Sequence, residues 1–139
     1  EFNCRMGDPE TQPIMMRLKS DLLVLLKHAV AGKLDQIEAE WDRRVALGVV
    51  LAAANYPETP RKGDIISGLP AESEDAHVFH AGTTEQDGKV VTAGGRVLCV
   101  TALGENVKQA QKRAYDTIAG IHFDGMQFRR DIGHRAISR

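Results

Sequence analysis

The opening residues of the chain place oxygen-bearing and cationic side chains at strand spacing. Residues two apart on a strand face the same side, so Glu1 and Asn3 are expected to present a carboxylate and an amide oxygen to one point. Such hard oxygen donors suit Mg²⁺ or Mn²⁺, which take further ligands from water and nucleotide phosphates. Arg5 continues this face, where its guanidinium could hold a phosphate or carboxylate in bidentate fashion. From spacing alone, a solvated strand face remains the alternative.

Two further side chains are candidates for ligand contact. Asp8 lies in a polar turn, where it either orders the turn or contacts a substrate. Arg96 follows Gly94 and Gly95, and glycines allow a backbone to approach a ligand closely. The alternative for Arg96 is an arginine that simply faces water after a hairpin.

The amino-terminal third is predicted to contain one helix. Pro13 suits its first position, and Gly32 is placed to end it. Apolar residues recur between them at helical spacing, at positions 15, 18, 22, 25 and 29. Because residues 24, 26 and 30 are also apolar, the helix should be buried against material outside this sequence.

The remainder is predicted to form an antiparallel sheet with a helix on one face, an α+β arrangement. Apolar runs predict strands at residues 45–54, 65–66, 78–79, 90–91 and 97–100, with a possible edge strand at 126–129. Asp87-Gly88 indicates a hairpin turn. Asn106 can cap a helix whose apolar face contains residues 107, 110, 114, 118 and 121.

The whole chain resembles the carboxy-terminal portion of glycinamide ribonucleotide synthetases, a family of the ATP-grasp superfamily. Residues 5–12 (RMGDPETQ) resemble the family signature, and the preceding Glu1-x-Asn3 is similar to its magnesium-binding pair. The likeness continues in order at residues 41–42, 47–50, 56–57, 63–64, 68–70, 79–83, 94–98 and 131–133. Carboxylases of the superfamily share Glu-x-Asn-x-Arg but diverge after the arginine, so Gly7-Asp8-Pro9-Glu10 argues against them.

The resemblance implies a ligase that joins glycine to 5-phosphoribosylamine, using ATP as co-substrate and Mg²⁺ or Mn²⁺. Residues 1–38 would end an ATP-grasp domain, and residues 39–139 would form the family's carboxy-terminal domain. Glu1 and Asn3 would hold the metal, and Arg5 would stabilise the reacting acid or its phosphorylated form. Asp8 and Arg96 would contact the ribose and 5′-phosphate of the substrate. The missing amino-terminal part of the same polypeptide would supply the rest of the site, so the fragment alone should be inactive.

Composition argues against several other classes of function. The chain has 139 residues, with 18 Lys and Arg against 19 Asp and Glu, which gives no overall field for nucleic acid or anionic lipid. No apolar run approaches the roughly 20 residues of a membrane span, so we expect a soluble, cytoplasmic protein. Cys4 and Cys99 lack zinc-site spacing. The alternative to a ligase fragment is a non-catalytic phosphosugar-binding or interaction module that reuses this domain.

Overall fold

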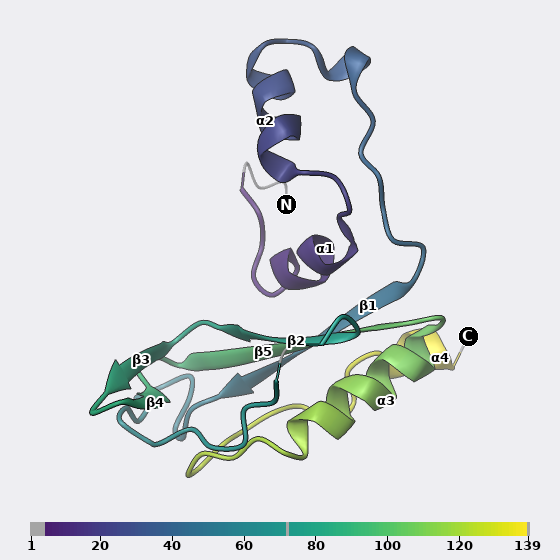
Figure 1. Ribbon diagram of the computed structural model, residues 1–139. Helices are drawn as coiled ribbons and strands as arrows, with labels where there is room; N and C mark the ends of the chain where they lie inside the picture. Colours follow the sequence, from purple (N-terminus) through teal and green to yellow (C-terminus); the bar gives the residue numbers. More distant parts are fainter. Residues whose placement is uncertain (1–4, 72, 139) are drawn as a thin grey trace.

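The computed structural model describes residues 5–71 and 73–138 (Figure 1). Its centre is a three-stranded antiparallel sheet of β1 (Val45–Ala52), β5 (Arg96–Gly104) and β2 (Ala76–His80), in the order β1-β5-β2. Helix α3 (Val107–Ile118) covers one face, and the amino-terminal helices lie on the other side of the sheet. The predicted antiparallel sheet with a packed helix is therefore confirmed.

The core lies between the sheet and α3. Leu51 and Leu98, from the two paired strands, and Phe123, after the helix, are completely buried. Ala110 and Ala114 on α3 are also fully buried, and their small side chains bring the helix close to β5. The predicted cap is present, because the Asn106 side-chain oxygen accepts a 2.9 Å hydrogen bond from the Gln109 backbone N–H.

A two-stranded hairpin of β3 (Thr83–Gln86) and β4 (Lys89–Thr92) extends from one end of the sheet (Figure 1). Its two turn residues, Asp87 and Gly88, have φ values of 50° and 70°. A type I′ turn needs positive φ at both central positions, which Asp-Gly accommodates. The predicted hairpin is confirmed.

The prediction of one amino-terminal helix is wrong. The structure has α1 (Thr11–Arg17), α2 (Leu22–Val30) and a short 3₁₀ turn, η1 (Leu34–Gln36). Leu18 is extended, and the Asp21 side chain accepts hydrogen bonds from the N–H groups of Leu23 and Val24 at 2.8 and 3.2 Å. Asp21 thus caps a second helix, a local signal that the apolar periodicity concealed.

Of the two predicted helix ends, the start is wrong and the end is confirmed. Pro13 is the third residue of α1 rather than the first. Gly32, at φ 66°, follows the carboxy-terminal cap of α2 as predicted.

Helices α1 and α2 have different surroundings. Pro13 on α1 lies against the sheet. A Cβ added to Gly48 on β1 would be 3.3 Å from the Pro13 ring, which shows how close the two are. Helix α2 buries no residue, and Leu23, Leu26 and Val30 are 59%, 52% and 92% exposed. Within residues 5–71 and 73–138, no helix is long and apolar enough to cross a membrane.

Two predicted short strands are reduced to isolated bridges. Ile65 pairs only with Val91, and Gln127 pairs only with Ala52 at the end of β1. Gln127 exchanges both backbone hydrogen bonds with Ala52, at 2.8 and 2.9 Å, but Gly125 just before it has φ 68°, outside the extended region. A terminal helix that the sequence did not indicate, α4 (His134–Ile137), follows the left-handed Gly133.

Candidate functional site

The two predicted substrate contacts, Asp8 and Arg96, meet in the structure. Arg96 Nη1 donates to Asp8 Oδ2 at 2.8 Å and to the Asp8 carbonyl at 3.3 Å, across 88 positions of sequence. Both side chains remain about half exposed, at 44% for Arg96 and 55% for Asp8. The pair therefore joins the turn before α1 to the first residue of β5 while staying open to solvent.

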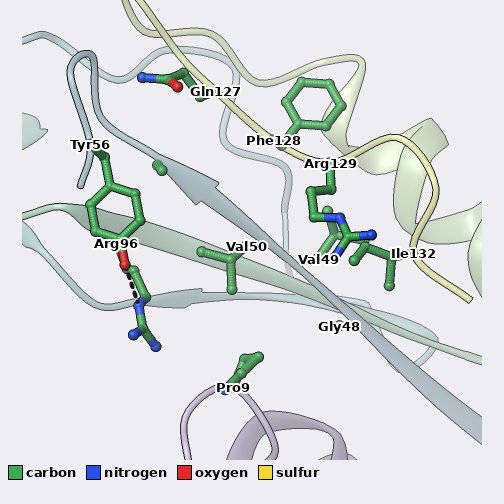
Figure 2. Close-up of a pocket in the computed structure, with 11 residues that line it drawn as sticks. Pro9, Gly48, Val49, Val50, Tyr56, Arg96, Gln127, Phe128, Arg129 and Ile132 are labelled. Atoms are coloured by element: carbon green, nitrogen blue, oxygen red, sulfur yellow. Dashed lines mark hydrogen bonds between the residues drawn. The ribbon is translucent and has the colours of Figure 1, made fainter.

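Tyr56 holds the other end of the same guanidinium. Arg96 Nε donates to the Tyr56 hydroxyl at 3.1 Å (Figure 2). This hydrogen bond is the largest cause that raises the pKa of Arg96 above its already high ordinary value, and the nearby Asp8 charge acts in the same direction. Arg96 is thus a permanent cation that is held from two sides.

The glycines before Arg96 make room for Tyr56. A Cβ on Gly95 would lie 2.7 Å from Tyr56 Cε2 and 3.2 Å from Pro60 Cγ. Gly94 lies against Gly82, whose own Cβ would be 2.7 Å from the Gly94 Cα. The sequence suggested that these glycines admit a ligand, whereas in the structure they make room for neighbouring protein atoms.

An open cavity of about 480 Å³ lies beside this pair, in the range of small-molecule sites (Figure 2). One wall is the outer face of β1, and the opposite wall is the segment before α4. Most of the lining is apolar, and Arg96 is one of two lining cations. The lining residues are Pro9, Gly48, Val49, Val50, Ala52, Tyr56, Arg96, Gln127, Phe128, Arg129 and Ile132.

The second cation of the cavity, Arg129, is bound differently. Its Nε and Nη2 donate to the two oxygens of Asp131 at 2.9 and 2.8 Å. This contact holds the pKa of Asp131 below its usual range. Because the bidentate pair occupies one edge of Arg129 while Arg96 gives Asp8 only one nitrogen, Arg96 is the better candidate to bind an anionic ligand.

Comparison with known proteins identifies the family. The profile of the family described as "Phosphoribosylglycinamide synthetase, C domain" matches residues 46–135, well over half of the chain. The chain belongs to this family. The match includes Tyr56 and Arg96 but not Asp8, so the site joins the family domain to the segment that precedes it.

Individual relatives agree with this assignment. The chain is 64% identical over its whole length to a phosphoribosylamine–glycine ligase of Ralstonia nicotianae and 62% identical to one of Neisseria meningitidis serogroup B. It spans 33% of the length of each. The crystal structure of the Thermotoga maritima phosphoribosylamine–glycine ligase matches 95% of the chain at 39% identity, with a TM-score of 0.74, and the match covers 32% of that protein.

Arg5, a further predicted site residue, does not line this cavity. Arg5 is exposed, and its guanidinium donates only to the neighbouring Met6 carbonyl among the described residues, at 3.1 Å. Glu1 and Asn3, the predicted metal ligands, lie outside the described residues. From residue 5 to 138, position 72 apart, no group of three or more His, Cys, Asp or Glu side chains is arranged to hold a metal ion.

Sequence reasoning missed several residues that build the cavity. Tyr56 was noted only within the family resemblance at residues 56–57, and Phe128 and Ile132 were assigned no role in a site. The available signal for Tyr56 was Gly95. A glycine has no side chain, so next to a candidate arginine it leaves room for an aromatic ring. No local signal places the segment around Phe128 opposite β1.

Proposed function

We propose that the chain is the carboxy-terminal part of a ligase that joins glycine to 5-phosphoribosylamine, with ATP converted to ADP and phosphate. The product would be glycinamide ribonucleotide, an intermediate of purine biosynthesis, and the enzyme would be cytoplasmic. The observation that carries this proposal is the 64% identity, over the full chain, to a relative named as a phosphoribosylamine–glycine ligase. The cavity supports it, because its lining residue Arg96 offers a cation, and Asp8, which is paired with Arg96, offers a carboxylate for a phosphorylated sugar.

The two paired side chains would divide the substrate between them. The guanidinium of Arg96 can bind the 5′-phosphate through charge-assisted hydrogen bonds, and the carboxylate of Asp8 can accept hydrogen bonds from ribose hydroxyls. Without ligand, the 2.8 Å ion pair satisfies both groups. The phosphate would therefore compete with Asp8 for one nitrogen of Arg96 and leave the carboxylate free for the sugar.

The phosphoryl-transfer part of the reaction would lie at the amino-terminal end of the chain. Glycine carboxylate would accept the terminal phosphate of ATP to give glycyl phosphate, which the sugar amine would then attack, releasing phosphate. Arg5 would stabilise the negative charge of the acyl phosphate. Mg²⁺ or Mn²⁺, held by Glu1 and Asn3, would offset charge on the nucleotide oxygens.

The exposed helix α2 supports the proposal that the chain works as part of a larger enzyme. Nearly all its residues are apolar, yet none is buried. A helix that is apolar all round is normally enclosed by other elements. We place residues 1–38 at the end of an ATP-grasp domain, whose other residues would cover α2, and residues 39–139 in the carboxy-terminal domain. The isolated chain is expected to have no ligase activity.

The test is a chimera in which this chain replaces the matching third of the Ralstonia relative. Glycinamide ribonucleotide and ADP are measured with ATP, glycine and freshly generated phosphoribosylamine. We expect turnover within about tenfold of the parent enzyme, a loss of less than about 1.4 kcal/mol in transition-state stabilisation. The parent lacking that third, and this chain alone, are the inactive controls.

Two results would contradict the proposal. The first is a chimera that folds and binds ATP but forms no amide. The second is tight binding of ribose 5-phosphate by the isolated chain together with an inactive chimera. That combination would favour a non-catalytic phosphosugar-binding module.

A further inference from the structure

Tyr56 is fixed by its surroundings before it contacts Arg96. It follows the end of β1, where its backbone N–H bonds to the Ala53 carbonyl at 3.2 Å. Ala53 in turn donates to the Gly95 carbonyl at 2.9 Å, which ties this turn to the residue preceding Arg96. The Tyr56 ring lies over the Cβ-free face of Gly95. The position of the hydroxyl is therefore set by the backbone of the same two segments that carry the two residues.

The hydrogen bonds of Arg96 decide which edge of its guanidinium an anion can use. Nε donates to the Tyr56 hydroxyl at 3.1 Å, and Nη1 donates to Asp8 Oδ2 at 2.8 Å and to the Asp8 carbonyl at 3.3 Å. Within the part of the chain that the structure describes, Nη2 makes no hydrogen bond to protein. A guanidinium offers two edges for bidentate binding, one formed by Nε with an Nη and one formed by Nη1 with Nη2. With Nε occupied by Tyr56, an anion that displaces Asp8 from Nη1 can use two parallel N–H groups only at the Nη1–Nη2 edge.

The chemistry of the tyrosine suits this task. A phenolic oxygen accepts the Nε–H bond while carrying no charge, so it orients the cation without neutralising it. A carboxylate in the same place would compete with an anionic ligand and offset the positive charge, as Asp131 offsets that of Arg129 in their ion pair. Phenylalanine would keep the ring over Gly95 but would leave Nε without its acceptor.

We propose that Tyr56 is the positioning residue that directs the Nη1–Nη2 edge of Arg96 toward the phosphate of the sugar-phosphate substrate. This inference rests on the proposed function for the identity of that substrate. The positioning role itself requires only that a phosphorylated sugar binds at Arg96. Tyr56 itself need not touch the ligand.

The experiment compares Tyr56→Phe and Arg96→Ala, singly and combined, in the Ralstonia chimera. Steady-state kinetics give kcat and KM for phosphoribosylamine, and calorimetry gives the Kd of the unreactive mimic ribose 5-phosphate. We expect Tyr56→Phe to raise both that KM and that Kd about 5- to 30-fold, with kcat and the KM for ATP within about twofold. In the Arg96→Ala background the tyrosine change should have no further effect, because its influence passes through the arginine.

Tyr115→Phe is the matched control, since it removes the only other tyrosine hydroxyl of the chain. That hydroxyl bonds to the backbone at Arg129 and Ile132 rather than to an arginine side chain. It should lower the melting temperature, and any change that it causes in the Kd for ribose 5-phosphate should be the same with and without Arg96, unlike the change caused by Tyr56→Phe.

The outcomes separate this inference from the proposed function. Unchanged ribose 5-phosphate affinity in a folded Tyr56→Phe chimera would overturn the positioning role, even if the enzyme is active. Equal losses from Tyr56→Phe with and without Arg96 would also overturn it, by showing that the tyrosine acts independently. An inactive chimera whose ribose 5-phosphate binding still depends on Tyr56 through Arg96 would reject the ligase proposal and support the positioning role.

Discussion

Helices α2 and α3 show how differently two parts of this chain use apolar residues. α3 is amphipathic and buries Ala110, Ala114 and Ile118 against the sheet. α2 is far more apolar, yet it buries nothing. The apolar content of a helix therefore does not decide its burial. What decides it is whether the chain provides an apolar surface opposite, and β1 and β5 provide one for α3 but not for α2.

The largest expected difference in stability is between a leucine-to-alanine substitution in the core under α3 and the same substitution on α2. Leu98→Ala removes a fully buried side chain from β5 and should lower the free energy of unfolding by about 2–5 kcal/mol. Leu26→Ala removes a side chain that is 52% exposed on α2 and should cost about 0.5 kcal/mol or less. Urea denaturation of this chain measures both. Similar losses at the two sites would show that α2 is already enclosed.

The stability loss caused by Leu26→Ala should become large when the chain is part of the chimera. In the Ralstonia chimera, the proposed ATP-grasp residues would cover α2, so Leu26→Ala should cost about 2–4 kcal/mol in the unfolding of that domain. Thermal unfolding of the chimera, with and without the substitution, provides the measurement. An effect as small as in the isolated chain would contradict the proposed packing of α2.

The Asp42–Arg44 pair, which lies between the amino-terminal helices and β1, should make the stability of the chain depend on pH. Arg44 binds Asp42 through Nε and Nη2, with the Nη2 contact at 2.7 Å, and binds Asp75 through Nη1 at 2.6 Å. The Arg44 side-chain hydrogen bonds are the largest cause that holds the pKa of Asp42 well below its usual range. Since the pKa is depressed on folding, the resulting stability is present above about pH 4 and is lost as the pH falls through the folded pKa.

Asp42→Asn should therefore reduce the loss of stability on acidification. Between about pH 4 and pH 2, the melting temperature of the variant should fall less steeply than that of the unmodified chain. Glu85→Gln, on exposed β3, controls for the removal of one carboxylate. Parallel curves for Asp42→Asn and the unmodified chain would exclude this role for the Asp42–Arg44 pair.

The smallest effect is expected at the wall of the cavity opposite β1. The Tyr115 hydroxyl donates to the Arg129 carbonyl at 2.7 Å and accepts from the Ile132 N–H at 3.2 Å. Tyr115→Phe should lower the free energy of unfolding by about 0.5–1.5 kcal/mol. Chemical denaturation checks this value. No change would mean that α3 does not anchor this segment through the hydroxyl.

Local signals in the sequence predicted the elements whose causes are local. The main strands of the sheet, the Asp87-Gly88 hairpin and the Asn106 cap were predicted because alternation, turn chemistry and capping act over a few residues. The single amino-terminal helix was a wrong prediction, because continuous apolar spacing outweighed the Asp21 cap. The edge strand predicted at residues 126–129 is reduced to the bridge between Gln127 and Ala52, since its pairing depends on where β1 ends.

The sequence by itself determined the family, the antiparallel sheet with its covering helix, and Asp8 and Arg96 as separate candidates. Only the tertiary structure decided that these two side chains meet, that Tyr56 holds the arginine, and that the segment around Phe128 closes a cavity. The physical reason is distance along the chain. An ion pair across 88 positions leaves no periodic or capping pattern, because it depends on how β5 and the turn before α1 are brought together.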